Sequence, residues 1–162
     1  MAGDELTPLG ESLVQAWFRT DSQTRSVLSA IDLESLLLRS RPDARTIGET
    51  FAHLIEVRVR RVEIIGGKNA LEDWEPLGEG DEESREALDA TLASSAERIA
   101  VVATDSLRRG AAVRGFADGV PGWLGYQIAH EAHHRGQILA ALAEAGKPVS
   151  SKVGYGIWEW GR

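Results

Sequence analysis

Three of the four histidines in the chain lie within five consecutive positions, from His130 to His134. If this stretch is helical, His130 and His134 stand one above the other, with their Cβ atoms about 5–6 Å apart. Two imidazoles at that spacing can bind the same divalent ion. Because two ligands are too few for a protein metal site, the spacing predicts that a third ligand comes from another part of the chain.

The residues around these histidines predict a long helix from Trp123 to Gly146. At 100° per residue, one face of this helix carries Trp123, His130, His134 and Gln137. A second face carries aliphatic residues, namely Leu124, Ile128, Leu139 and Leu142. The charged residues of the helix are few, namely Glu131, Arg135 and Glu144. A helix with so little charge is expected to be surrounded by other helices.

His53 is the candidate for the third ligand. It falls in a second predicted helix, which begins at a capping box over residues 46–49 and runs to about residue 65. A single histidine on a helix is more often a packing or surface residue than a ligand. If the two helices face each other, however, His53 completes a site of three imidazoles that keeps coordination positions open for water or substrate. His133 lies about 60° around the helix from His130, and we leave it out of the predicted site.

The same residues allow two other kinds of metal site. His130, Glu131 and His134 form the pattern H-E-x-x-H, in which two histidines hold zinc and the glutamate activates water in zinc peptidases. A peptidase needs a third ligand downstream, such as Glu144 or Glu159, and usually a sheet edge, yet no segment resembles a strand. Glu131-x-x-His134 is also half of a di-iron carboxylate motif, but the chain has no second copy of it. A zinc peptidase therefore stays as an alternative function.

Four helices are expected to position these residues. Hydrophobic spacing predicts helices over residues 9–31, 46–65, 81–106 and 123–146, with irregular connections at 66–83 and 108–122. The tail, residues 147–162, contains Tyr155, Trp158 and Trp160 and is expected to fold back on the bundle. The predicted fold class is therefore all-α, with a single four-helix-bundle domain over residues 1–162.

The composition excludes several functional classes. The 162 residues carry a formal net charge of −7, which argues against sequence-independent binding to nucleic acid. The chain has no cysteine, which removes disulfides, thiolate metal ligands and a cysteine nucleophile, so that any sulfur chemistry needs a thiol substrate. The N-terminal residues do not resemble a signal peptide and no apolar run is long enough to span a membrane, so we expect a cytoplasmic protein without a membrane partner.

Two motifs together resemble those of the DinB/YfiT-like family of metalloenzymes. The first is Arg45-Thr46-Ile47-Gly48-Glu49 leading into His53-Leu54, and the second is His130-x-x-x-His134-Arg135-Gly136-Gln137-Ile138. The resemblance covers about residues 9–146. It implies an up-down-down-up four-helix bundle that holds one divalent metal ion with one histidine of the second helix and two of the fourth. In this sequence those residues are His53, His130 and His134.

The resemblance also implies a function. Family members with an assigned activity include thiol-dependent S-transferases and isomerases that use bacillithiol, mycothiol or glutathione, and the family is commonly dimeric. We therefore expect a homodimeric, metal-dependent enzyme that acts on a small molecule with a low-molecular-weight thiol. Gln137 matches the glutamine of the family motif and, with Glu131, is a candidate catalytic residue. The glycine-and-tryptophan tail departs from the proline-rich ending of several members.

Zinc is the expected metal, with nickel, iron or manganese as alternatives. Three neutral imidazoles leave such an ion its full positive charge, so that it lowers the pKa of a bound water or thiol. Glu56 and Tyr126 join Glu131 as candidates for proton transfer. A metal-binding bundle without catalytic activity is a further alternative.

Overall fold

The computed structural model describes residues 5–160. Its long helices are α1 (Pro8–Ala30), α2 (Ile47–Gly66), α3 (Arg85–Arg109) and α4 (Gly119–Glu144), and a short helix, α5 (Ser151–Gly156), follows them. Short 3-10 turns, η1 (Glu34–Leu37), η2 (Lys68–Leu71) and η3 (Asp81–Glu83), lie in the connections. Within residues 5–160 the β pairing is limited to one isolated bridge, so the predicted all-α class is confirmed. No helix in that range is both long and apolar enough to cross a bilayer.

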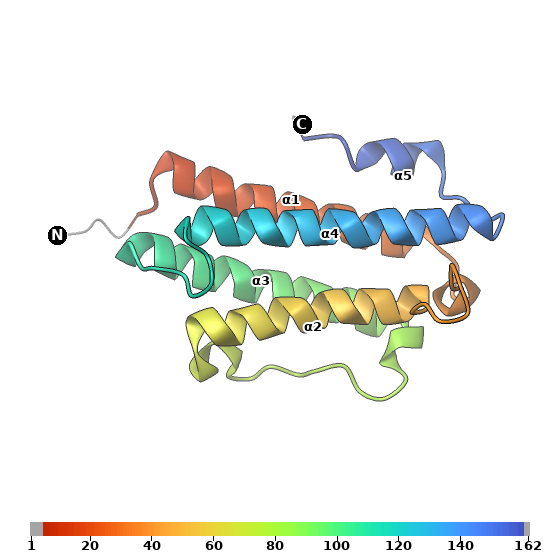
Figure 1. Ribbon diagram of the computed structural model, residues 1–162, viewed down its shortest axis with the longest axis horizontal. Helices are drawn as coiled ribbons and strands as arrows, with labels where there is room; N and C mark the ends of the chain where they lie inside the picture. The colour runs from red at the N-terminus through yellow and green to blue at the C-terminus, as the bar shows by residue number, and fades with distance from the viewer. Residues whose placement is uncertain (1–4, 161–162) are drawn as a thin grey trace.

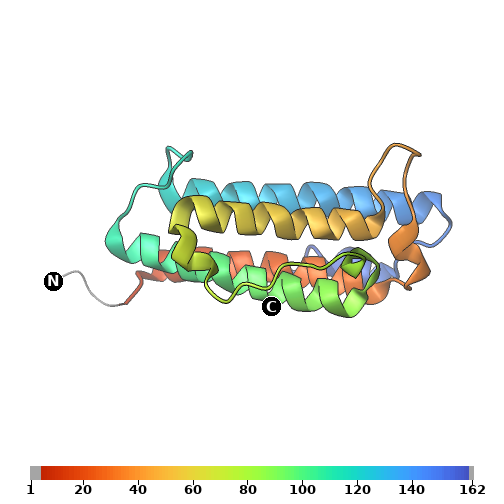
Figure 2. The ribbon, with the colours of Figure 1, turned by 90° about the horizontal axis from the view of Figure 1, so that it is seen from below.

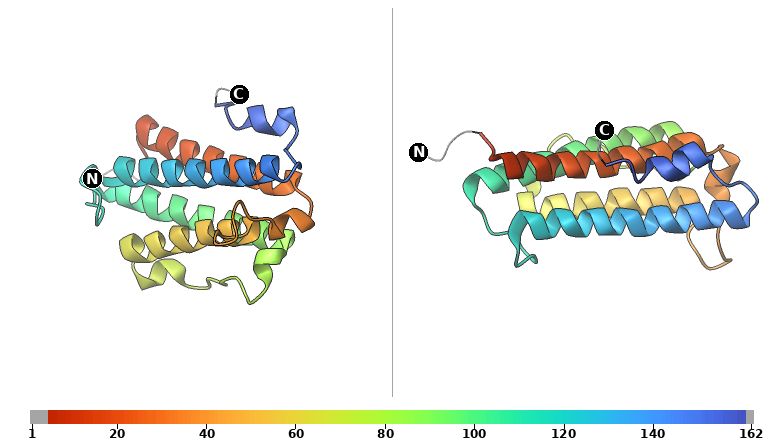
Figure 3. Two further views of the ribbon diagram at one scale, coloured as in Figure 1. Left: turned by 45° about the vertical axis from the view of Figure 1, so that its right-hand side comes forward. Right: turned by 90° about the horizontal axis from the view of Figure 1, so that it is seen from above.

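The four long helices form an up-down-down-up bundle, as the family resemblance implied. Helices α1 and α4 run in one direction along the bundle, and α2 and α3 run in the other (Figure 1). Helices α2 and α3 are parallel because the connection between them, residues 67–84, returns along the length of the bundle (Figure 2). Helices α3 and α4 each pack against both α1 and α2, which places α2 and α4 side by side (Figure 3).

Helix α2 begins at the predicted capping box. The Thr46 hydroxyl accepts a hydrogen bond from the Glu49 amide at 3.0 Å, and the Glu49 carboxylate accepts one from the Thr46 amide at 2.5 Å. Gly48, two residues after Thr46, lies against the Glu82 carbonyl oxygen. A Cβ atom at this position would overlap that oxygen. Glycine at this position therefore lets the 67–84 connection pack closely on the start of the helix that carries His53.

Two predicted helix boundaries were wrong by about one turn. Helix α4 begins at Gly119 and not at Trp123, because Pro121 lies in the first turn, where backbone amides have no partner within the helix. Helix α3 begins at Arg85 and not at residue 81, because residues 81–83 form η3 and the Ser84 hydroxyl then caps α3.

The tail folds back on the bundle, as expected, but its aromatic rings do not anchor it. Helix α5 lies against α1. The tail residues that pack against the core are aliphatic, namely Val149, Val153 and Ile157. Tyr155 and Trp158 are 74% and 75% exposed. The rings therefore form part of the surface.

Two apolar clusters fill the bundle, one built around Phe51 and Leu88 and the other around Trp17 and Trp123. A layer of buried polar side chains, which we name the charged layer, separates them along each long helix. Its members are Asp21 and Thr24 of α1, Arg58 of α2, Ser95 of α3, and Glu131 and Arg135 of α4.

Arg58 is at the centre of the charged layer. Its Nε donates a hydrogen bond to Glu131 Oε1 and its Nη1 donates one to Asp21 Oδ1, each at 2.8 Å. The same Nη1 donates to the Leu92 carbonyl of α3 at 2.8 Å, and the second Glu131 oxygen accepts from the Thr24 hydroxyl at 2.6 Å. One guanidinium thus connects all four long helices. Because a buried charge without partners is costly, these contacts constrain the register of the bundle.

Replacing Arg58 tests this role. The substitution Arg58→Met keeps an apolar stem but leaves two buried carboxylates without their cation, so we expect the free energy of unfolding to fall by about 3–5 kcal/mol. Denaturant titration followed by circular dichroism measures the change. The control is Arg60→Met, at an exposed position of the same helix, which should change the free energy by no more than about 0.5 kcal/mol. Equal losses in the two variants would contradict a central role for Arg58.

Candidate metal centre

The structure brings His53 of α2 together with His130 and His134 of α4. One ring nitrogen from each imidazole lies within 4.8 Å of the other two. The ring centroids are 4.5 Å apart for His130 and His134, 4.9 Å for His53 and His134, and 5.4 Å for His53 and His130. The predicted meeting of the two helices at these residues is confirmed, and the three imidazoles could hold one metal ion.

The nitrogen positions fit a divalent ion. His130 Nε2 and His134 Nε2 are 3.2 Å apart. Two nitrogens each about 2.0–2.1 Å from a tetrahedral zinc ion are separated by about 3.3 Å. His134 Nδ1 lies 2.7 Å from Gln137 Oε1, which as an amide oxygen can only accept a hydrogen bond. When Nδ1 carries the ring proton and donates it to this oxygen, Nε2 keeps its lone pair, which is the tautomer that ligation through Nε2 requires.

The charged layer explains why these imidazoles face α2. Glu131 follows His130 directly, so its side chain leaves α4 about 100° further around the axis. Arg58 holds Glu131 in the core, and this ion pair fixes the rotation of α4 that turns His130 and His134 toward His53. Arg58 also follows His53 by five residues on α2, so the same ion pair sets the level at which the two helices meet.

The pKa of each imidazole in the group is lowered, and burial is the largest cause in every case. The positive charge of Arg45 lowers the pKa of His53 further. The pKa of His134 falls to about 4, although its hydrogen bond with Gln137 acts in the opposite direction. The three imidazoles are therefore neutral at pH 7, which is the form that binds a metal.

Aromatic and cationic side chains form the rim near His130. The Tyr126 ring stacks on the His130 ring with centroids 5.8 Å apart, and Arg61 lies over the rings of Tyr126 and Phe116 at 5.1 and 5.5 Å. The spacing of four residues between Tyr126 and His130 is a signal that places both rings on one face of α4. Arg61 and Phe116 were not among the predicted site residues, because no local spacing in the sequence relates α2 to the connection before α4.

Two cavities lie beside the histidines. The first, of about 510 Å³, is lined by His53 and Trp74 among others, and we name it the His53 cavity. The second, of about 550 Å³, is lined by His134 and Gln137 among others, and we name it the His134 cavity. Arg45 lines both cavities. The candidate metal centre is therefore accessible to small molecules from two sides.

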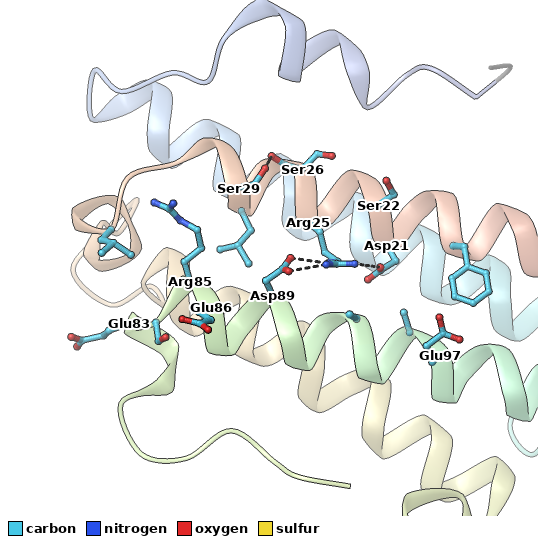
Figure 4. Close-up of a pocket in the computed structure, with 16 residues that line it drawn as sticks. Asp21, Ser22, Arg25, Ser26, Ser29, Glu83, Arg85, Glu86, Asp89 and Glu97 are labelled. Carbon is cyan, nitrogen blue, oxygen red and sulfur yellow. Dashed lines mark hydrogen bonds and ion pairs between the residues drawn. The ribbon is translucent and has the colours of Figure 1, made fainter.

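A larger cavity lies elsewhere, in a groove of about 1070 Å³ between α1 and α3 (Figure 4). The three histidines are not among the residues that line it. Its central charges are already paired with one another. Arg25 donates to both carboxylate oxygens of Asp89 at 2.7 Å and lies 3.9 Å from Asp21. The central charged groups of this groove are therefore already paired, and we do not take it as the candidate site.

The other predicted site residues differ in their surroundings. Gln137 is exposed and contacts His134 directly. His133 is exposed and its ring centroid lies 5.0 Å from that of His134, outside the three-imidazole group. Glu131 is 1% exposed, with its carboxylate oxygens bound by Arg58 and Thr24. Gln137 is therefore the predicted catalytic residue that lies at the candidate centre itself.

Residues 4–155 match the model of the DinB family. This chain belongs to the DinB family. The match covers both helices that carry the candidate ligands and the whole charged layer of this DinB bundle. A search of curated proteins found no match to the chain.

Acidification tests the lowered pKa of His134. In metal-free protein we expect this imidazole to stay neutral down to about pH 4, as followed by NMR of its ring protons. The unfolded chain protonates the same group near its ordinary pKa of 6.5. As the pH falls from 6.5 to about 4, the unfolded state therefore takes up a proton that the folded state does not, and folding stability decreases. A titration midpoint at the ordinary pKa would show that burial does not perturb this residue.

Proposed function

We propose that this DinB protein holds one divalent metal ion with His53, His130 and His134 and catalyses transfer of a low-molecular-weight thiol to a small electrophilic molecule. The observation that carries the metal site is the convergence of three neutral imidazoles with two Nε2 atoms 3.2 Å apart. Zinc is the proposed ion. Nickel, iron or manganese are alternatives, because imidazole binds several of these metals well.

The ion, when bound, keeps its full charge beside neutral ligands and lowers the pKa of a coordinated thiol or water. The residues of the chain supply orientation and surroundings. Gln137 Oε1 can accept a hydrogen bond from Nδ1 of His134 and so hold its ring in the ligating orientation. Tyr126 packs on the ring of His130.

The two cavities support a reaction between two molecules. In the proposed transfer, the thiol sulfur forms a bond to an electrophilic carbon and the bond from that carbon to its leaving group breaks. The thiol proton passes to solvent or to the leaving group, so that the reaction needs no oxidant. The His53 cavity has apolar walls that include Val59, Trp74 and Leu77, which suit an apolar electrophile.

The zinc-peptidase alternative has less support. It needs Glu131 beside the ion as the residue that activates water, yet this side chain is buried in the charged layer. Burial alone would raise the pKa of Glu131, but the charge and hydrogen bonds of Arg58 and the hydrogen bond of Thr24 together lower it. We infer that Glu131 stays ionised and positions α4, and that Gln137 is the polar group that acts at the centre.

We also propose a homodimer in the cytoplasm. The family resemblance and the composition motivate both proposals. The exposed rings of Tyr155 and Trp158 support the first, because they offer apolar surface that a subunit contact would bury.

Metal content tests the proposed ligands. Purified protein dialysed against zinc should contain about one ion per chain by elemental analysis. We expect His53→Ala, His130→Ala and His134→Ala each to weaken zinc binding by at least about tenfold in calorimetric titrations, because each removes one of three ligands. The matched control is His133→Ala, an exposed histidine of the same helix, which should bind zinc as the wild type does. A loss of affinity in this control as large as in the others would reject the assignment of ligands.

Thiol conjugation tests the reaction. Zinc-loaded protein is incubated with a panel of low-molecular-weight thiols and apolar electrophiles, and the conjugates are measured by mass spectrometry. We expect conjugation with at least one pair, and its loss in His53→Ala, which removes a ligand from the centre. Tight metal binding without conjugation for any pair would favour a metal-binding bundle without catalytic activity. Cleavage of unstructured peptides that Glu131→Gln abolishes would instead support the peptidase.

A further inference from the structure

We propose that Arg45 binds an anionic group of the substrate, so that the site prefers thiols that carry a carboxylate. This inference rests on the proposed function, because it places the reacting end of the substrate at the three histidines. Arg45 lines both cavities beside them. It directly precedes Thr46, the N-cap of α2, so the ordered start of that helix holds its backbone in place.

Among the residues that the structure describes, Arg45 makes no ion pair or hydrogen bond, whereas its neighbours are engaged. Arg39 donates to the Ala44 carbonyl at 2.9 Å and lies 3.8 Å from Glu49. Arg41 lies 3.6 Å from Asp43. The guanidinium of Arg45 is therefore available, and a guanidinium can bind one carboxylate with two parallel hydrogen bonds.

The charges of the two cavities determine where an anion would lie. The charged residues of the His134 cavity are Arg41, Asp43 and Arg45, of which the first two offset each other. Gln137 adds its amide nitrogen as a donor, since its oxygen is taken by His134. The His53 cavity is also lined by two arginines, Arg45 and Arg60, but four glutamates outnumber them, namely Glu49, Glu56, Glu63 and Glu82. A substrate carboxylate is thus repelled from the His53 cavity and attracted to the His134 cavity.

The charge of Arg45 also acts on the candidate centre. It is the second cause, after burial, of the lowered pKa of His53. The whole chain carries a net charge of −7, yet this side of the centre combines neutral imidazoles with an unpaired cation. A locally positive region on an acidic protein raises the local concentration of anions, so the substrate class that fits it is acidic.

The test uses cobalt(II)-loaded protein and pairs of thiols of equal length. One member of each pair ends in a carboxylate and the other in a neutral amide, from 3-mercaptopropionate and 3-mercaptopropionamide up to 6-mercaptohexanoate and its amide. The change in visible absorption of the cobalt centre as each thiol is added gives the dissociation constants. We expect at least one carboxylate thiol to bind about tenfold more tightly than its amide.

Variants assign this preference to one residue. Arg45→Gln removes the charge and should bring the two members of each pair to nearly equal affinity, with cobalt content and the affinity for amides unchanged. Arg45→Lys keeps a charge without the two-pronged geometry and should retain part of the preference. Arg39→Gln, which removes a nearby charge that lines neither cavity, should keep the whole of it.

Each outcome decides between the two proposals. A carboxylate preference that persists in Arg45→Gln, or that is absent from the wild type, overturns the role of Arg45 and leaves the metal centre in place. A wild-type protein that binds neither cobalt nor any thiol overturns the proposed function and the role of Arg45 together.

Discussion

The guanidinium of Arg58 lies where the four long helices meet, and the rest of the structure depends on satisfying it. A charge in an apolar interior is costly unless it is paired with an opposite charge and hydrogen-bonded. Asp21, Glu131 and the Leu92 carbonyl accept hydrogen bonds from Nε and Nη1 on behalf of the other three helices, and the Trp17 ring lies 4.9 Å from the guanidinium. The third nitrogen, Nη2, is buried without a hydrogen-bond partner among the residues that the structure describes. Apolar clusters alone tolerate a helix that slides or turns by a small amount. Directional hydrogen bonds between buried charges do not.

This constraint gives α4 two inward faces with different tasks. Glu131 and Arg135 lie on the face that enters the charged layer, and His130 and His134 lie on the adjacent face, toward α2. The low charge of α4 predicted a helix surrounded by others, which was wrong for one face, because Gly125, Ala132, Gly136 and Ala140 are exposed along it. Two of its few charged residues, Glu131 and Arg135, are buried. Glu131 accepts a hydrogen bond from Arg58, and Arg135 donates one to the Thr24 hydroxyl.

The region around the three imidazoles is electrically asymmetric. Burial keeps the rings neutral, Arg45 supplies an unpaired cation, and the nearby glutamates line the His53 cavity and not the His134 cavity. The acid closest in sequence to Arg45 on α2, Glu49, is occupied in capping the helix. An acidic protein thus presents a locally positive cavity next to a centre with the geometry for a divalent ion. In the proposed function, the same site therefore binds the metal ion and selects the charge of the substrate.

The sequence by itself determined what depends on local spacing. Helical geometry brings residues four apart together, so the pairing of His130 with His134 and the capping box at Thr46 were both readable, and the family motifs placed His53 with them. Only the tertiary structure decided the role of Glu131. The pattern H-E-x-x-H suggested a residue at the metal, but Arg58, 73 residues away in the chain, holds it in the core. The place of Arg45 in the His134 cavity and the contact of Arg61 with Tyr126 likewise depend on packing between separate segments. Packing of this kind produces no regular spacing in the sequence, so it could not be predicted.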